Sequence, residues 1–463
     1  MNNEEFRSYA HQVVDWMADY LENIRDYPVL PDIQPGALVD QLPASAPEHG
    51  ERMDAILKDF ENSIVPALTH WNHPRFLAYF AISGSYPGIL GEMLSGVLNV
   101  NGMLWKSCPA LTELEQVTLG WLRQWMGLSP DFFGIIYDTA SIASMHAIAA
   151  AREMADPEAR TRGNTGNLTL YSSADAHSSI EKGAITLGIG QDNVRKIPVD
   201  EAFRMRVDVL RETMTSDREA GKKPFCVVAT VGTTSTSSID PVPAIAAVAE
   251  EFGAWLHIDA AYGGAAAVVP ELRYILEGSE RAHSLVVNPH KWLFTPVDLS
   301  AFYTSRPDIL RRAFSLVPEY LKTAEDARAL NYMDYGVQLG RRFRALKLWF
   351  VMRHYGHEGI AELIRSHINY AQKLAGLIRS DPDFEVAAPT PFSLVCFRYR
   401  GSDQDNQALL DKINASGRAF LSHTVLNGRF ALRLAIGNFA TTWEDIEEVW
   451  GVIKQSAETY NKT

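Results

Sequence analysis

The chain contains few cysteines and no long apolar run. Cys108, Cys226 and Cys396 are its only cysteines, and none of them forms a CxxC pair, which excludes a disulfide framework and a thiolate zinc site. No apolar stretch approaches the roughly 20 residues that a membrane span needs. Residues 1–5 are acidic, whereas a signal peptide begins with a basic region. We therefore expect a cytoplasmic protein with no membrane partner and no metal site.

Basic residues are outnumbered, because 43 Lys and Arg stand against 56 Asp and Glu. The resulting net charge of −13 repels phosphate backbones, so we expect no nucleic acid partner. The 463 residues are 46% apolar and 21% charged, which is typical of a folded globular chain and excludes a disordered one. A chain of this length has room for two or three domains.

Several common catalytic signatures are also absent. The sequence has no GxxxxGK[ST], GxGxxG, HExxH or GxSxG motif. Nucleotide kinases, simple dehydrogenases, zinc proteases and α/β-hydrolases therefore lose support.

The central part of the chain alternates strand-like and helical segments. Short apolar runs at 225–230, 255–258 and 284–287 predict strands, and an alanine-rich helix is predicted over 242–252. This alternation predicts an α/β fold with a mostly parallel sheet, in which ligands bind at the carboxyl ends of the strands. We predict three parts: an N-terminal helical segment over 1–85, a large α/β domain over 86–352 and a small α+β domain over 353–463.

An amphipathic helix is predicted over residues 5–25, where apolar residues recur every three or four positions. Five prolines between residues 27 and 47 prevent a helical continuation. The helix packs either on another domain or subunit or back onto its own chain. Periodicity alone does not distinguish these arrangements.

Two predicted strand ends carry residues suited to catalysis. Lys291 lies in Asn288-Pro-His-Lys-Trp292, directly after the strand at 284–287, where desolvation would make it a Schiff-base nucleophile. Asp259 follows the strand at 255–258 and precedes small residues. Pyridoxal 5'-phosphate needs a lysine and a carboxylate for its pyridinium nitrogen, so the pair predicts this cofactor. The alternatives are a surface lysine and a helix-capping aspartate.

Two further segments complete the predicted cofactor site. Thr139, Ala140 and Ser141 lead from an apolar strand into a helix of small residues, and backbone amides at a helix N-terminus bind anions such as a phosphate. Ordinary capping by Thr and Ser is the alternative interpretation. His177 could bring its ring onto the face of the cofactor, although a lone histidine is more often a core residue.

These motifs resemble those of the aromatic-L-amino-acid decarboxylases, which are group II pyridoxal-phosphate decarboxylases, and the resemblance covers almost the whole chain. It rests on Thr139-Ala-Ser141, Ala176-His-Ser-Ser179, Gly232-Thr-Thr234 with Asp240, the segment from His257 to Tyr262, Asn288-Pro-His-Lys-Trp292, and Gly340-Arg-Arg-Phe-Arg-Ala-Leu-Lys-Leu-Trp349. The early stretch His73-Pro-Arg-Phe-Leu-Ala-Tyr-Phe80 matches as well. The resemblance implies a fold-type-I enzyme that forms a homodimer.

The resemblance also implies a role for each site residue. Lys291 would form the Schiff base, Asp259 would pair with the ring nitrogen and His177 would stack on the ring. A mobile-loop tyrosine, placed at Tyr332 with Tyr335 as a rival, would donate the proton. The other expected cofactor contacts are Thr139, Ala140, Ser141, Thr234, Ala261, Asn288 and His290.

The substrate implied by the resemblance is an aromatic amino acid. Its side chain would lie in an apolar pocket formed by Trp71, Tyr79, Phe80, Ile82, Leu104 and Gly356. Ile82 stands where the catechol-using animal members carry a hydroxyl residue, which shifts the preference from DOPA toward tryptophan or phenylalanine. Gly356 matches the small residue of plant members with indole preference, or it is a helix C-cap glycine.

Two residues depart from the family's pattern. Asp138 stands where many relatives have a glycine, and a carboxylate beside a phosphate is unfavourable unless it points away. Lys106 stands where relatives usually have a small residue, so the pocket would be narrower or carry a charge.

The sequence thus predicts decarboxylation of an aromatic L-amino acid to its arylalkylamine, with tryptophan slightly ahead of phenylalanine, tyrosine and DOPA. The nearest alternative is an aromatic aldehyde synthase, which in the plant members has phenylalanine at the loop position and is disfavoured by Tyr332. An aminotransferase, with Arg433 available to bind a carboxylate, and a scaffold that has lost its cofactor are further alternatives.

Overall fold

The computed structural model describes residues 1–164, 166–316 and 328–458. They form two compact units. The large unit comprises residues 82–380 and 386–396, and the small unit comprises residues 1–81, 381–385 and the described residues from 397 onward. The N-terminal segment therefore shares a unit with C-terminal residues, whereas the sequence predicts separate parts over 1–85 and 353–463.

The large unit contains a seven-stranded sheet in the order β1-β7-β6-β5-β4-β2-β3. The strands from β6 to β3 pair in parallel, whereas β7 runs antiparallel to both β1 and β6. This confirms the predicted mostly parallel α/β fold. The strands are β1 (Phe133–Tyr137), β2 (Leu168–Ser173), β3 (Val194–Ile197), β4 (Lys223–Thr230), β5 (Trp255–Asp259), β6 (Ser284–Val287) and β7 (Ser300–Thr304).

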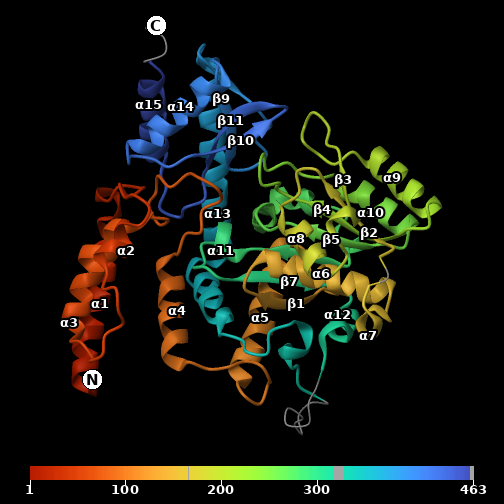
Figure 1. Ribbon diagram of the computed structural model, residues 1–463, viewed down its shortest axis with the longest axis horizontal. Coiled ribbons are helices and arrows are strands. Elements are labelled where there is room, and N and C mark those ends of the chain that lie inside the picture. Colours follow the sequence, from red (N-terminus) through yellow and green to blue (C-terminus); the bar gives the residue numbers. More distant parts are fainter. Residues whose placement is uncertain (165, 317–327, 459–463) are drawn as a thin grey trace. The chain divides into compact units, whose positions relative to one another are not determined.

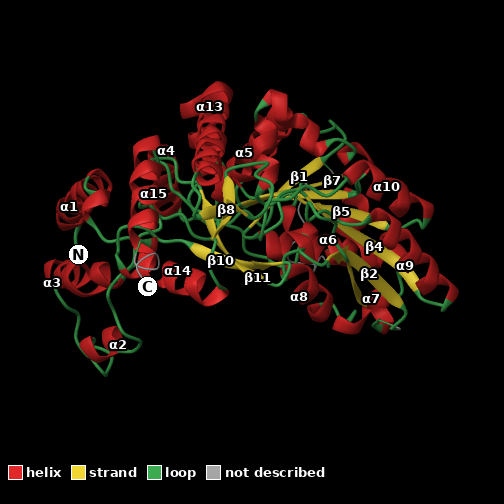
Figure 2. Ribbon diagram, turned by 90° about the horizontal axis from the view of Figure 1, so that it is seen from above, coloured by secondary structure: helices red, strands yellow, loops and turns green. Residues whose placement is uncertain are grey.

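Helices cover both faces of this sheet, with α6 and α8 on one face and α5 and α10 on the other (Figure 2). Alanines of α6 such as Ala143 and Ala147 are fully buried in the core with Val228 and Val286 of the strands. These small side chains let the helix pack closely on the sheet. The helices are α4 (Tyr86–Leu98), α5 (Pro109–Met126), α6 (Ala140–Ala155), α7 (Ala159–Arg162), α8 (Ser179–Thr186), α9 (Val207–Glu219), α10 (Val242–Glu251), α11 (Pro289–Trp292), α12 (Pro307–Phe314) and α13 (Arg344–Ser380).

The small unit combines helices with an antiparallel hairpin, in which Ser422 of β10 lies opposite Arg433 of β11. The hairpin belongs to a four-stranded sheet in the order β10-β11-β9-β8, and the chain passes between the units within β8 and β9. Capping boxes begin α1, α14 and α15. The elements are α1 (Asn3–Glu22), α2 (Ala37–Gln41), α3 (Met53–Asp59), β8 (Phe384–Val386), β9 (Leu394–Tyr399), α14 (Asp403–Ala415), β10 (Ser422–Leu426), β11 (Arg429–Ala435) and α15 (Trp443–Ala457).

The first helix packs on its own unit through part of its surface. Figure 1 shows α1 beside α3, and the Trp16 ring packs edge-on against Phe60 with a centroid distance of 4.9 Å. Phe6, Val13 and Val14 of α1 are exposed. The helix therefore contacts its own chain and still presents apolar side chains to the outside.

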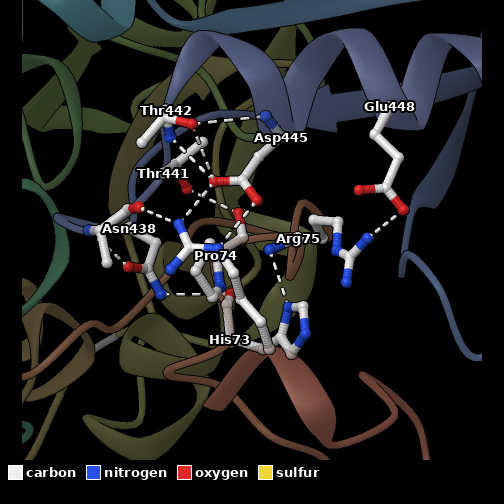
Figure 3. A network of polar contacts seen from close by, with 10 residues as sticks. His73, Pro74, Arg75, Asn438, Thr441, Thr442, Asp445 and Glu448 are labelled. Carbon is white, nitrogen blue, oxygen red and sulfur yellow. Dashed lines mark hydrogen bonds and ion pairs between the residues drawn. The ribbon is translucent and has the colours of Figure 1, made fainter. Parts of the chain in front are cut away.

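The N-terminal segment around His73 is built into the C-terminal part of the small unit. The Asn438 side-chain amide donates to the His73 carbonyl at 3.2 Å (Figure 3). Further on, the Leu77 N–H donates to the Phe420 carbonyl at 2.9 Å. These main-chain contacts explain why the two ends of the chain form one unit.

Candidate active site

The predicted aspartate and lysine lie at neighbouring strand ends of the large unit. β5 and β6 pair in parallel with Asp259 opposite Val286, so both strands end at the same edge of the sheet. The Asn288 N–H donates to the Ala261 carbonyl at 3.0 Å, which joins the segments that follow the two strands. Lys291 lies on α11, directly after β6. The topology therefore brings the predicted pair together.

The electrostatics of Lys291, Asp259 and His177 are linked. Burial lowers the pKa of Lys291, and the Asp259 carboxylate opposes this shift. Desolvation also lowers the pKa of His177, which Asp259 raises and Lys291 lowers. The three side chains thus lie within electrostatic range of one another, and Lys291 has the desolvated environment that a nucleophilic amine needs.

The orientation of the His177 ring is set by Ser179, a residue of the quoted motif to which the sequence assigns no separate role. The Ser179 N–H donates to His177 Nδ1 at 3.2 Å, and the Ser179 hydroxyl lies 2.8 Å from the same nitrogen. Because Nδ1 accepts a backbone hydrogen bond, the neutral ring carries its proton on Nε2. His177 thereby has a fixed tautomer at the end of β2.

Ser300 of β7 connects Asn288 to the turn that precedes Thr139. Thr139 caps α6 by accepting a hydrogen bond from the Ile142 N–H at 3.4 Å, so the anion-binding capacity of this helix N-terminus lies with its other first-turn amides. The Ser300 hydroxyl lies 2.6 Å from Asn288 Oδ1 and 3.4 Å from the Asp138 carbonyl. Ser300 therefore joins the segment after β1 to the segment after β6.

Two other predicted cofactor residues occupy adjacent turns. Thr234 is exposed in the turn after β4, and Ala261 is buried in the turn after β5. A Cβ on Gly232, whose φ is +90°, would lie 2.8 Å from the Gly263 nitrogen, so the two turns approach as closely as glycine allows. His290 is buried, its Nδ1 accepts from the Leu299 N–H at 2.9 Å, and burial lowers its pKa to about 3.

Tyr332 is enclosed in the core of the large unit. Its hydroxyl donates weakly to the Gly134 carbonyl at 3.5 Å, and the Arg341 guanidinium lies 4.5 Å from its ring centroid. The charged groups that act on its pKa are Glu115 and Arg341, after the dominant effect of burial. The structure therefore does not bring Tyr332 to Lys291, Asp259 and His177, and Tyr335 beside it also packs on Phe133 of β1, with ring centroids 5.0 Å apart.

The predicted substrate residues divide between the units. Trp71, Tyr79 and Phe80 belong to the small unit, where the Trp71 and Tyr79 rings stack with centroids 5.9 Å apart. Ile82, Leu104 and Gly356 belong to the large unit.

Gly356 lies between two helical segments, and Lys106 lies on the surface. Gly356 joins the two helical parts of α13 with φ 66° and ψ 177°, a conformation that essentially only glycine adopts. The backbone therefore accounts for this glycine. Leu104 packs with Met333, and Lys106 is exposed.

Tyr79 adopts a left-handed backbone conformation, with φ +52°, that a hydrogen-bonded pair on the hairpin holds. The Tyr79 N–H donates to Ser422 Oγ at 3.2 Å, and Arg433 donates to Ser422 Oγ at 2.8 Å and to the Tyr79 carbonyl at 3.5 Å. The Arg433 guanidinium also lies 5.4 Å from the Phe80 ring centroid. Arg433, which the sequence leaves open as an aminotransferase residue, thus contacts the aromatic segment, the stretch from Trp71 to Phe80. No local sequence motif predicts this role.

The fold and the linked lysine, aspartate and histidine define a fold-type-I pyridoxal-phosphate enzyme. Residues 35–400 match the pyridoxal-dependent decarboxylase conserved domain, and the chain belongs to this family. It is 40% identical over 489 residues to phenylacetaldehyde synthase of a Rosa hybrid cultivar (100% of this chain, 96% of the relative) and 39% identical over 468 residues to aromatic-L-amino-acid decarboxylase of Catharanthus roseus (98% and 93%). The crystal structure of Oryza sativa TDC with PLP and tryptamine matches with a TM-score of 0.96 and 37% identity over 99% of each chain.

These comparisons confirm the predicted family, fold and cofactor, pyridoxal 5'-phosphate. The residues of this chain fit that group, since a partly desolvated Lys291 lies within electrostatic range of the Asp259 carboxylate and the N-terminus of α6 supplies phosphate donors. The protein is an aromatic amino acid decarboxylase or an aromatic aldehyde synthase.

In residues 1–164, 166–316 and 328–458, no helix is long and apolar enough to cross a bilayer. Within the same residues, no group of three or more His, Cys, Asp or Glu side chains is arranged to hold a metal ion.

Proposed function

We propose that the protein decarboxylates an aromatic L-amino acid, releasing carbon dioxide and the corresponding arylalkylamine. Tryptophan is placed slightly ahead of phenylalanine, tyrosine and DOPA. The observation that carries the proposal is the linked group of Lys291, Asp259 and His177 at the carboxyl edge of the parallel sheet. Ile82 supports the order of substrates, because its side chain offers no partner to a ring hydroxyl.

Each residue of this group has a distinct task. When bound, pyridoxal 5'-phosphate supplies an electron-accepting ring. The Lys291 amine would hold the cofactor, and the Asp259 carboxylate would favour a proton on its ring nitrogen. His177, whose ring is oriented by Ser179, would cover one face of the cofactor and exclude water from it. Asp259 would thereby favour loss of the substrate carboxylate as carbon dioxide, because it would stabilise the negative charge that develops on the substrate and the cofactor ring in the transition state.

The residue that donates the proton is sought among the tyrosines of the segment that precedes Gly340. Only three tyrosines, Tyr320, Tyr332 and Tyr335, occur between residues 305 and 340. Tyr332 and Tyr335 pack on β1, and Tyr320 lies outside the described residues. We therefore transfer the expected donor role to Tyr320 by elimination.

An aromatic aldehyde synthase is the second candidate, and the 40% identity to phenylacetaldehyde synthase favours it. In that reaction loss of carbon dioxide is followed by oxidative deamination, in which dioxygen is the oxidant and aldehyde, ammonia and hydrogen peroxide are the products. The preference for the amine now depends on Tyr320, because Tyr332 is enclosed in the core. An aminotransferase loses support, since Arg433 holds Ser422 and Tyr79.

The deciding experiment incubates the cofactor-loaded protein separately with tryptophan, phenylalanine, tyrosine and DOPA. Carbon dioxide, amine, aldehyde and peroxide are assayed together, with Lys291→Ala as the control. Amine formed in step with carbon dioxide, and lost in the variant, supports the decarboxylase. Aldehyde with peroxide transfers the assignment to the synthase, and amino transfer to 2-oxoglutarate without carbon dioxide refutes both.

We also propose that the enzyme is a cytoplasmic homodimer. Apolar residues four positions apart on α4 are exposed, namely Tyr86, Leu90, Leu94 and Leu98, and so is the neighbouring Val97. Such a row is typical of a protein interface. Sedimentation of the protein should show a dimer, and Val97→Glu should weaken it.

The cysteines support the proposed cytoplasmic location. All three are buried and unbridged, which is compatible with a reducing compartment.

A further inference from the structure

Asp138 lies in the turn between β1 and α6, next to the amides expected to bind the cofactor phosphate. Its Oδ1 accepts a hydrogen bond from the Thr139 N–H at 2.6 Å, and its Oδ2 accepts one from the Gln338 side-chain amide at 3.2 Å. Both carboxylate oxygens are therefore engaged within the protein. The Gln338 contact spans 200 positions of the sequence, so the fold alone creates it.

The segment that carries Gln338 is firmly seated on β1 and α6. The Tyr137 hydroxyl donates to the Tyr335 carbonyl, and the Val337 N–H donates to His146 Nε2 at 3.3 Å. Between them, a Cβ on Gly336 would lie 3.1 Å from His146 Cε1 and 3.2 Å from Tyr137 Cε1. The backbone thus reaches Tyr137 and His146 as closely as a residue without a side chain allows. The contacts of Tyr335 and Val337 with β1 and α6 therefore place Gln338 beside Asp138.

We propose that Gln338 is a positioning residue that turns the Asp138 carboxylate away from the cofactor phosphate. A carboxylate free to rotate in this turn would repel the bound phosphate and weaken cofactor binding. With Gln338 in place, the carboxylate is held by three donors, namely the Thr139 N–H and hydroxyl on Oδ1 and the Gln338 amide on Oδ2, and the remaining first-turn amides of α6 stay available to the phosphate. Because binding and positioning are linked reciprocally, the cofactor in turn stabilises the segment from Tyr335 to Gln338.

The test compares pyridoxal 5'-phosphate with pyridoxal, which lacks the phosphate and still reacts with Lys291. Each is titrated into the cofactor-free protein, and binding is followed by the visible absorbance gained on joining Lys291. Gln338→Ala should weaken pyridoxal 5'-phosphate binding about tenfold, the order expected for one nearby like charge at the protein surface. Pyridoxal binding should be unchanged. Inorganic phosphate, used as a competitor, should lose affinity by a similar factor.

A double variant identifies the carboxylate as the cause. Asp138→Asn removes the charge, so Asp138→Asn with Gln338→Ala should bind pyridoxal 5'-phosphate within about twofold of the natural chain. Val337→Ala, which alters the neighbouring exposed side chain and keeps the backbone contact with His146, is the matched control and should change nothing.

Three results would overturn the proposal. If Gln338→Ala weakens pyridoxal and pyridoxal 5'-phosphate equally, Gln338 only supports the fold. If it changes neither, the carboxylate needs no restraint. If Asp138→Asn fails to restore binding in the double variant, the repulsion does not come from Asp138. None of these readouts depends on which aromatic amino acid is turned over, so failure here is separate from failure of the proposed reaction.

Discussion

The two units build their candidate site residues in opposite ways. In the large unit, Asp259 and Lys291 lie within five residues of the strands that position them, and the parallel pairing of β5 and β6 brings them together. In the small unit, Tyr79 is held by Ser422 and Arg433, which are 343 and 354 positions away in the sequence. Chemistry at strand ends is therefore a local property of the sequence, whereas the aromatic segment depends on distant contacts.

This difference predicts where substitutions act. Changes at the sheet edge should impair the chemical step, because those residues are the ones proposed to hold the cofactor. Changes at the hairpin should alter recognition of the aromatic side chain and leave cofactor binding intact.

The largest effect is expected for Asp259→Asn. The amide preserves the shape of the side chain but removes the charge that favours a protonated ring nitrogen, so kcat should fall about 10²- to 10³-fold. Steady-state kinetics and cofactor titration measure the two consequences separately. Asp308→Asn, at an exposed carboxylate of the same unit, is the control and should be silent. An unchanged kcat in Asp259→Asn would remove Asp259 from the mechanism.

The next effect separates the two tyrosines. Tyr320→Phe should lower amine formation about 10²-fold and divert product toward aldehyde and peroxide, because a positioned proton donor is lost. Tyr332→Phe removes a hydroxyl whose contact with Gly134 is weak, so it should cost less than about 1 kcal/mol of stability and leave the product unchanged. Product analysis and thermal unfolding check both expectations. The opposite pattern would return the donor role to Tyr332.

A smaller, more selective effect is expected at the hairpin. Arg433→Lys keeps the charge but cannot hold Ser422 and the Tyr79 carbonyl together, so Tyr79 and Phe80 should shift. The KM for aromatic amino acids should rise about tenfold while cofactor affinity stays constant.

Matched variants of the same hairpin make this test specific. Arg429→Lys alters an exposed arginine of β11 that pairs with Glu385 and should leave KM unchanged. Ser422→Thr retains the acceptor oxygen and should behave like the natural chain, whereas Ser422→Ala should resemble Arg433→Lys. Equal changes in KM and cofactor affinity would show a general loss of structure instead.

The local patterns of the large unit made much of its site predictable. The strand predicted over 284–287 is β6 itself, and the helix predicted over 242–252 is α10 with one extra residue. Their consequence, polar residues at the carboxyl ends of parallel strands, follows from general rules of α/β folds. The same patterns predict Lys291, Asp259 and His177 as site residues, and the structure places the three within electrostatic range of one another.

The unpredicted features depend on contacts that leave no local signal. β7 lies between β1 and β6 and runs antiparallel to both, which places Ser300 between the segments that follow those two strands. No pattern in residues 300–304 predicts this strand direction. For Gly356 the sequence leaves a pocket residue and a helix-cap glycine open, and its positive φ between two helical segments agrees with the helix-cap interpretation. Counting back along the chain placed the donor at Tyr332, because burial against β1 is a tertiary property that spacing does not reveal.

The smallest expected effect concerns pH and compares one buried histidine from each unit. Burial lowers the pKa of His257 in the large unit and of His73 in the small unit to about 4, below the value of about 6.5 in an unfolded chain. As the pH falls from 6.5 to 4, the unfolded chain therefore binds protons that the folded chain excludes. Stability is fully present above pH 6.5 and declines through this window, by about 1.4 kcal/mol per pH unit for each such histidine.

Replacing either histidine tests whether the two units unfold together. His257→Gln and His73→Gln should each reduce the slope of unfolding free energy against pH by about 1.4 kcal/mol per pH unit, measured by urea unfolding between pH 4.5 and 6. If the units unfold in one transition, both variants change the same slope. If they unfold separately, His257→Gln changes only the transition of the large unit. An unchanged slope in both variants would mean that neither histidine excludes protons in the folded chain.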